Sequence, residues 1–213
     1  MEKANDMEAV RRITADKIQS ILEMANDGSR KAILANLRRG AGRDPGELPE
    51  LWGEFLENLP ETLYGSERGP SRAEWAIYTA LTLFALHQQG HDPKQERERM
   101  HQEKIGLGAA AAKIALADGA EDKDSAMERV RRRFNIAVTA DSMEKLSWHL
   151  RGLVQLMSDK SIGMDYGKLA ADLYRYQFPA MRNKVRLEWG QDFYREYGKA
   201  ASSGGKEERD GNG

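Results

Sequence analysis

Arginine side chains are concentrated in the second half of the chain, where their guanidinium groups could bind phosphate oxygens in pairs. Residues 129–186 hold 12 basic and 5 acidic side chains, although the whole chain has a net charge of -1. The densest group consists of Arg129, Arg131, Arg132 and Arg133. At the helical step of 100°, Val130 and Phe134 fall on one side and Arg132 on the other. The spacing predicts a packed helix that displays its arginines; guanidinium groups in such positions suit a nucleic-acid backbone, and a solvated helix face is the alternative.

Other arginines lie at the edges of the apolar stripes of later helices. Arg151 borders one such stripe, and Arg182 and Arg186 share a side of the last helix with apolar residues. We include these three among the candidate nucleic-acid contacts. The alternative is a solvated helix face, or ion pairs with acids such as Glu188 and Asp192.

The segment 106–111 (GLGAAA) loosely matches the glycine-rich fingerprint of dinucleotide-binding proteins. That fingerprint requires a preceding strand, and residues 101–105 do not have a strand pattern, so we expect no nucleotide cofactor. A smaller possibility is that free backbone N–H groups at this helix start, together with Lys104, bind one phosphate. Simple entry into a helix is the alternative.

Residues that could perform catalysis or bind a metal are scattered. His87 and His91 have a chelating spacing, but Gly90 lies between them and no third ligand follows. The sequence contains no cysteine, no HExxH motif and no nucleophile elbow. We therefore expect a protein that is not an enzyme, with no metal and no cofactor. A helical hydrolase that uses His87 or His91 is a remaining alternative.

The composition indicates a globular protein outside the membrane. Hydrophobic residues make up 40% of the chain and charged residues 31%. The longest apolar runs, such as 76–86, fall well short of the roughly 20 residues that span a bilayer. The first ten residues lack the pattern of a secretory signal, so we expect a cytoplasmic location.

The elements that must position the arginines are helices. Apolar residues recur every three or four positions along almost the whole chain, and β-branched alternation is rare. We predict an all-α fold, a two-lobed helical bundle of about nine helices. The helix starts are marked by Ser71 with Glu74, Ser125 with Glu128, Asp141 with Glu144, Asp165, and Pro179.

An acidic segment from Asp118 to Asp124 is the best candidate for a boundary between lobes. We expect an N-terminal helical lobe over residues 1–118 and a C-terminal four-helix lobe over residues 119–198. Residues 199–213 consist mainly of Ser, Gly and charged residues, and their only apolar side chains are two alanines. The segment therefore has too little apolar surface to bury, and we predict that this tail is disordered.

A series of segments in fixed order resembles the CasB family, the small subunit of the type I-E CRISPR surveillance complex Cascade. No single segment is diagnostic, but the order and spacing extend from about residue 10 to residue 197. The segments are 35–40 (ANLRRG), 48–52 (LPELW), 80–87 (ALTLFALH), 106–108 (GLG), 132–135 (RRFN), 149–154 (HLRGLV), 165–173 (DYGKLAADL) and 189–194 (WGQDFY).

This resemblance implies a non-catalytic helical subunit that is present as a pair in the complex. Its partners would be the other Cascade subunits, including the backbone subunits, the crRNA, the target DNA and a second copy of itself, with no membrane. Arg38 and Arg39 match a basic pair of the family, and Arg132, Arg133 and Arg151 match basic positions in its second lobe. The alanine-rich helix that begins near Gly106 departs from the family, because it retains only Lys113 as a basic side chain.

The residues leave two functions open. In the first, basic helix faces bind the nucleic-acid backbone and stabilise guide RNA and the R-loop in antiviral defence. In the second, the chain is a helical protein–protein interaction scaffold whose arginines meet acidic protein surfaces.

Overall fold

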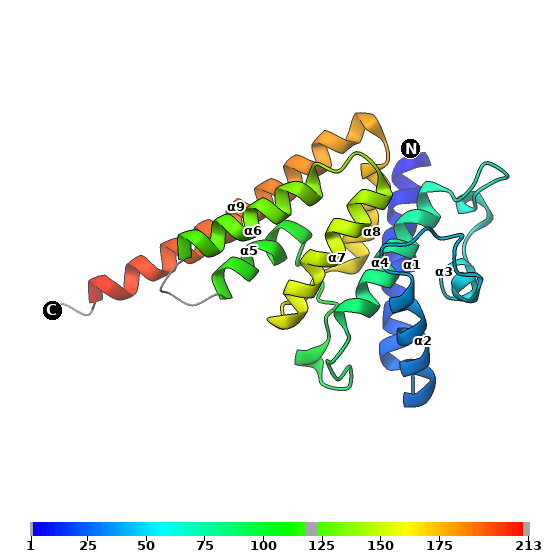
Figure 1. The fold of residues 1–213 in the computed structure, drawn as a ribbon, viewed down its shortest axis with the longest axis horizontal. Helices are drawn as coiled ribbons and strands as arrows, with labels where there is room; N and C mark the ends of the chain where they lie inside the picture. The colour runs from blue at the N-terminus through cyan, green and yellow to red at the C-terminus, as the bar shows by residue number, and fades with distance from the viewer. Residues whose placement is uncertain (1, 118–122, 211–213) are drawn as a thin grey trace.

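The computed structural model describes residues 2–117 and 123–210 of the 213-residue chain, and this part contains nine α-helices and no β-strand (Figure 1). The predicted all-α fold is therefore confirmed. The helices are α1 (Glu2–Glu23), α2 (Asp27–Arg39), α3 (Trp52–Leu56), α4 (Arg72–His87), α5 (Leu107–Ala117), α6 (Lys123–Val138), α7 (Met143–Asp159), α8 (Tyr166–Tyr176) and α9 (Pro179–Asp210). Three short 3₁₀ turns are η1 (Pro49–Leu51), η2 (Glu61–Leu63) and η3 (Glu96–Glu98).

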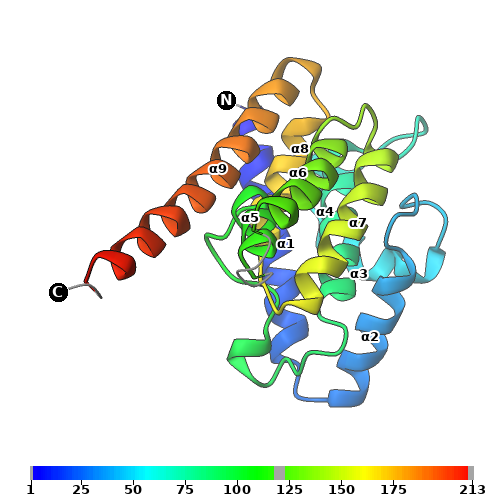
Figure 2. The same cartoon turned by 60° about the vertical axis from the view of Figure 1, so that its left-hand side comes forward.

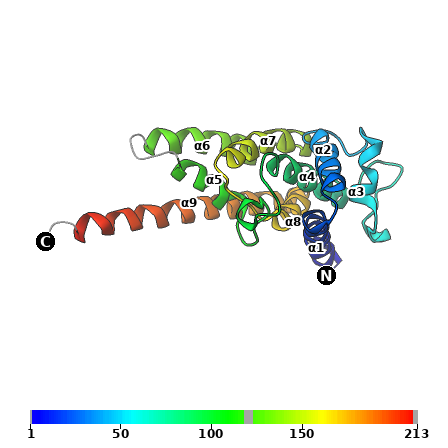
Figure 3. The same ribbon diagram turned by 90° about the horizontal axis from the view of Figure 1, so that it is seen from below.

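The helices form three layers, which Figure 3 shows edge-on. One outer layer contains α6, α7 and α2, and the opposite outer layer contains α9, α8 and α1. Helices α5 and α4 lie between them: α5 packs against α9 and α6, while α4 packs against α8, α7, α2 and α1. The end of α9 projects away from the other helices (Figures 1 and 2).

Helix α4 is the most buried element of the fold. It begins with the predicted capping box: the Ser71 hydroxyl accepts a hydrogen bond from the Glu74 N–H, and the Glu74 carboxylate accepts one from the Ser71 N–H. Every residue from Ala73 to Ala85 is buried, as expected for a helix that is apolar on all sides. Helix α4 therefore forms the centre of the larger end of the molecule.

The other predicted helix starts differ in their outcome. Asp165 caps α8 as expected, because its carboxylate accepts a hydrogen bond from the Lys168 N–H at 2.8 Å. Helix α7 is capped by Ser142 and not by Asp141, whose carboxylate instead pairs with Lys145 at 2.9 Å. Helix α6 begins at Lys123, so Ser125 lies inside its first turn and does not precede it.

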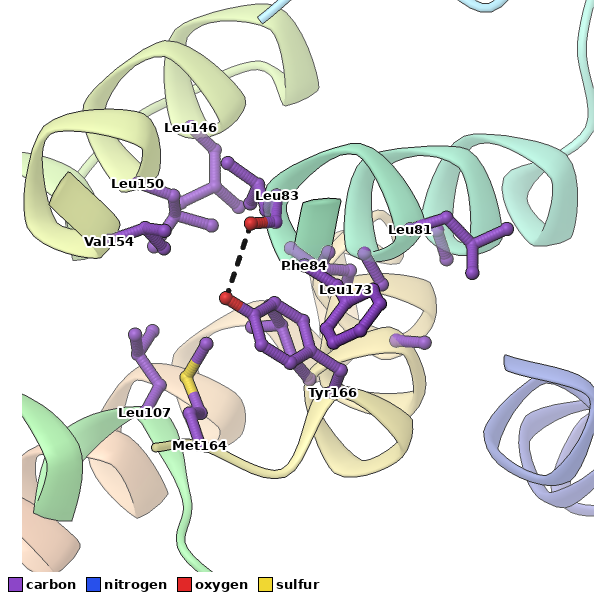
Figure 4. Close-up of a cluster of buried hydrophobic side chains, with 14 of the residues drawn as sticks. Leu81, Leu83, Phe84, Leu107, Leu146, Leu150, Val154, Met164, Tyr166 and Leu173 are labelled. Atoms are coloured by element: carbon purple, nitrogen blue, oxygen red, sulfur yellow. Dashed lines mark hydrogen bonds between the residues drawn. The ribbon is translucent and has the colours of Figure 1, made fainter. Parts of the chain in front are cut away.

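Large apolar side chains from four helices and one loop meet in a continuous core (Figure 4). Leu146, Leu150 and Val154 of α7 face Leu83 and Phe84 of α4, with Leu173 of α8 on the other side. The Tyr166 ring lies among them and donates a hydrogen bond from its hydroxyl to the Leu83 carbonyl at 3.3 Å. The phenol is fully buried, so this bond and the one to His87 satisfy its polar end.

The alanine-rich helix α5 approaches α9 very closely. A Cβ atom added to Gly108 would lie 1.9 Å from the Trp189 carbonyl oxygen and 2.9 Å from the Phe193 nitrogen. Ala110, Ala111 and Ala112 are completely buried beside it. The small residues of α5 therefore serve helix packing, which explains why this helix carries few basic side chains.

Most of the segment predicted to separate two lobes is not among the residues that the structure describes. Residues 118–122, where the boundary was expected, lie outside the described residues. Packing crosses the division in both directions, because α5 contacts α9 and α6 while α8 contacts α1 and α4. The two-lobe division stays a prediction.

Helix α9 continues to Asp210, so it includes most of the segment 199–213 for which the sequence predicts disorder. Tyr197 is the last described side chain of α9 that packs against the core. Residues 211–213 lie outside the described residues, and the predicted disorder of the tail is not tested by side-chain contacts.

The close approach at Gly108 predicts opposite effects for two glycine substitutions. Gly108→Ala should lower the free energy of unfolding by at least about 2 kcal/mol, because the added methyl group overlaps backbone that cannot move independently. Gly152→Ala on α7, where a Cβ meets nothing within 4 Å, should raise it by about 0.5–1 kcal/mol. Urea unfolding of both variants measures this. Equal effects of the two substitutions would contradict the proposed packing constraint.

Burial of His87 predicts a pH-dependent stability. Desolvation, followed by the charge of His91, lowers the His87 pKa to about 3, whereas the unfolded value is about 6.5. The unfolded chain therefore binds a proton that the folded chain excludes, and stability falls as the pH drops below about 6.5. Near pH 5 this group contributes a slope of about 1.4 kcal/mol per pH unit.

Substitution His87→Gln should reduce the slope of unfolding free energy against pH by that amount, measured by denaturant titration between about pH 5 and 6. Above about pH 7.5, where His87 is neutral in both states, the slopes of the variant and the parent should coincide. An unchanged slope at low pH would show that His87 is not excluded from protonation in the fold.

Candidate nucleic-acid interface

Three of the arginines on α6 have exposed side chains. Val130 and Phe134 point into the core, and this places Arg129, Arg132 and Arg133 at the surface. None of the three guanidinium groups forms an ion pair with a side chain that the structure describes. Five residues of one helix thus carry three cations that no described carboxylate neutralises, and these cations can bind an anion.

Arg131, the remaining member of the run, has a different role. Its guanidinium forms an ion pair with Glu128 on the same helix. A hydrogen bond to the Tyr194 hydroxyl, followed by the charge of Glu128, raises the pKa of Arg131. This side chain therefore links the outer surface of α6 to α9.

The exposed arginines border a hollow of about 420 Å³ between α6, α7 and α5. Apolar side chains and basic side chains line it together, with one carboxylate among them. The lining residues are Ile114, Glu128, Arg129, Val130, Arg132, Arg133, Leu156 and Lys160. The surface at this point is concave and mostly cationic, which suits a phosphate-bearing ligand.

Arg151 on α7 and the basic pair on α2 belong to the same outer layer as α6 (Figure 3). Arg151 is half-buried, and its guanidinium carbon lies 5.7 Å from the ring centre of Trp148. Among the described side chains neither Arg151 nor Arg38 has an ion-pair partner, whereas Arg39 pairs with Glu50 at 2.9 Å. The end of α2 reaches α7 at this point, since Gly42 lies against the Trp148 indole.

Arg182 and Arg186 on α9 use their guanidinium groups inside the protein. The Arg182 Nε donates to the Tyr176 carbonyl oxygen at 3.1 Å. Arg186 donates to the Ala140 carbonyl oxygen at 2.9 Å and to the Tyr176 hydroxyl at 3.1 Å. Both cations lie over the Tyr176 ring, and α9 belongs to the opposite outer layer. The structure does not bring this pair together with the α6 arginines.

Lys104 and Lys113 lie beside carboxylates. The Lys104 backbone N–H, in a left-handed conformation with φ of 69°, donates to Asp165 at 2.9 Å. A Cβ on Gly106 would lie 2.9 Å from an Asp192 carboxylate oxygen, so an acid already faces the start of α5. Lys113 lies 3.9 Å from Glu196. These two lysines therefore belong to a surface separate from the α6 arginines.

Sequence reasoning missed Trp148 as a candidate. Its side chain is 60% exposed, in contrast to the buried Leu146 and Leu150 of the same helix. The signal was present, because residue 148 falls outside the apolar stripe at helical spacing. The composition of the segment alone did not reveal it, since tryptophan is usually counted as a core residue.

Comparison with known proteins identifies the family to which this chain belongs. The family model for CRISPR-associated protein Cse2 matches residues 33–194, which is most of the chain. The crystal structure of CasB from Thermobifida fusca is 30% identical, with a TM-score of 0.65, and the alignment covers 88% of this chain and 97% of that one. The chain belongs to the Cse2 family. Among curated proteins no match was found.

Two further solved structures share the Cse2 fold. A Cse2-family protein from Thermus thermophilus is 22% identical, with a TM-score of 0.61 over 85% of this chain and 97% of that one. A chain of a CRISPR RNA-guided surveillance complex is 18% identical, with a TM-score of 0.67 over 92% of this chain and 99% of that one. The resemblance to CasB predicted from the segment series is therefore confirmed.

The described residues offer neither a metal site nor a membrane-spanning helix. No group of three or more His, Asp or Glu side chains is arranged there to hold a metal ion. None of the helices in the same part of the chain combines the length and apolar character needed to cross a membrane. His87 and His91 form hydrogen bonds within the fold, to the Tyr166 hydroxyl and to Ser158 respectively.

The inward contacts of Arg186 predict a structural role. Arg186→Met should lower the free energy of unfolding by about 1–3 kcal/mol, because the buried Ala140 carbonyl oxygen and Tyr176 hydroxyl lose a charged donor. Lys184→Met, at an exposed position of the same helix, should change stability by no more than about 0.5 kcal/mol. Thermal or urea unfolding distinguishes the two. Equal stability of both variants would show that Arg186 is not required for packing.

Proposed function

We propose that this Cse2-family chain is a non-catalytic small subunit of a type I-E CRISPR Cascade complex in the cytoplasm. Its basic surface holds the nucleic-acid backbone and thereby stabilises the guide RNA and the R-loop in antiviral defence. The observation that carries the proposal is the group of exposed guanidinium groups of Arg129, Arg132 and Arg133 on α6, which form no ion pair with a side chain that the structure describes. Arg38 and Arg151, in the same layer, extend the surface.

The proposed partners are other Cascade subunits, including the backbone subunits, together with crRNA, target DNA and a second copy of this chain. Family membership supports this assignment, as does the shared fold with a chain of a CRISPR RNA-guided surveillance complex. The near-neutral net charge of -1 suggests that the nucleic-acid contact works within an assembly, where other subunits supply further positive charge.

A modest cationic surface is sufficient for this task. In RNA-guided recognition, base pairing reads the sequence, and exchanging a DNA duplex for a guide–target duplex is nearly balanced in free energy. A few arginine–phosphate contacts can then favour the open state without reading any base. The exposed positions on α6 fit this requirement, because guanidinium groups recognise phosphate whatever base it carries.

Removing two of these charges tests the proposal. Arg132→Ala combined with Arg133→Ala should leave helicity unchanged but shorten the R-loop lifetime in the reconstituted complex. The slope of log affinity against log salt should fall by about two, roughly one for each phosphate contact, with sequence preference unchanged. The measurement is DNA dissociation at several salt concentrations.

The matched control is Arg97→Ala combined with Lys184→Ala, which removes the same charge from η3 and α9, outside the α6, α7 and α2 layer. We expect its salt dependence to equal that of the parent. Unchanged R-loop lifetime in the Arg132 and Arg133 variant would defeat the proposal. Reduced assembly into the complex, with normal DNA retention by the complexes that form, would instead support the interaction scaffold.

A further inference from the structure

Trp148 is the most exposed aromatic side chain among the described residues, with 60% of its surface accessible. It lies on α7, where residues 146, 147 and 150 are buried and residue 148 points away from them. Exposing an indole to water forgoes a large apolar contribution to folding, so its position calls for another explanation.

Two neighbours of the largely exposed Trp148 side chain lie close to its indole. Its Cε3 atom would lie 3.5 Å from a Cβ on Gly42, and Gly42 has a positive φ of 84° that favours glycine. The loop after α2 therefore reaches the six-membered ring of the indole at a residue that has no side chain. Arg151 approaches the ring from α7, with its guanidinium carbon 5.7 Å from the ring centre.

Other exposed aromatic side chains have their polar atoms engaged, whereas Trp148 does not. The Trp52 indole N–H donates to the Pro45 carbonyl oxygen at 3.3 Å, and the Tyr64 hydroxyl donates to the Leu56 carbonyl oxygen at 2.9 Å. The Trp148 indole N–H has no hydrogen-bond acceptor among the described residues. Trp148 therefore combines a largely exposed indole with an N–H group that no described residue accepts.

The charges near Trp148 favour an anionic ligand. Arg151 and Arg38 have no ion-pair partner in the described part of the chain, whereas the nearby Arg39, Arg43 and Lys145 pair with Glu50, Glu47 and Asp141. Glu144, one turn before Trp148 on α7, carries a negative charge that offsets part of this positive charge. An exposed indole with the Arg151 guanidinium beside it matches a nucleotide, which presents a flat base and a phosphate together.

We propose that Trp148 is a stacking platform for an unpaired base of single-stranded nucleic acid, with Arg151 oriented toward the adjoining phosphate. The inference rests on the proposed function, because it assumes that the α6, α7 and α2 layer faces nucleic acid. It adds a contact to the base, which backbone binding by arginines does not require. Bases inside a duplex already stack on their neighbours, so we assign the ligand to the displaced, unpaired strand of the R-loop.

The test uses the reconstituted complex with two target DNAs, one normal and one whose displaced strand has abasic sites in place of bases. Trp148→Ala should accelerate loss of the normal DNA by a factor on the order of 5 to 150, the range for one stacked base. It should leave loss of the abasic DNA unchanged. Trp148→Phe should retain most of the stability, because it keeps a ring that can stack.

Ile136→Ala is the matched control, since it removes a 48% exposed apolar side chain from α6 of the same layer without removing a π face. We expect it to behave as the parent with both DNAs. If Trp148→Ala acts equally on normal and abasic DNA, or acts on neither, the stacking proposal is overturned. If it reduces incorporation of the chain into the complex, Trp148 contacts a protein and the proposal is likewise overturned.

The outcomes also separate this inference from the function on which it rests. When the Arg132 and Arg133 double variant weakens retention of both DNAs while Trp148→Ala changes neither, backbone binding stands and only stacking fails. When the double variant has no effect on either DNA, the proposed nucleic-acid surface itself fails.

Discussion

The architecture depends on the close packing of α5 against α9 around Trp189. The Trp189 indole N–H donates to the buried Asp172 carboxylate at 2.8 Å, and Asp172 also accepts from Arg175 and Lys168 of its own helix. A buried carboxylate is tolerated only when such donors surround it, so this network fixes α9 against α8. Gly108 then allows α5 to touch the backbone of α9 directly.

This constraint divides the arginines by function. Helices α6 and α9 lie in opposite outer layers and meet through the stacked rings of Phe134 and Phe193, so their outward surfaces face different sides of the molecule. Arg182 and Arg186 on α9 hold Tyr176 and the end of α6, whereas Arg129, Arg132 and Arg133 on α6 remain exposed. Similar sequence patterns therefore have different physical roles, a distinction that the proposed function requires.

Local signals predicted much of the fold because capping is a local interaction. The capping box of Ser71 with Glu74 and the cap at Asp165 involve residues three apart, and both form as predicted. The start of α7 was wrong by one residue: Asp141 and Ser142 are both good caps, and an ion pair to Lys145 engages Asp141. Ser125 failed as a cap because α6 extends two residues further toward its N-terminus.

The helical class, the helix starts at Ser71 and Asp165 and the family could be predicted from the sequence, because periodicity, capping and ordered segments are properties of neighbouring residues. Which arginines remain exposed depends instead on how the helices pack. Arg186 and Arg132 have similar surroundings along the chain, but one meets the Ala140 carbonyl oxygen, 46 residues away, and the other meets solvent. The exposure of Trp148 was decided in the same way, since burial depends on which helices cover a face and not on the residue type.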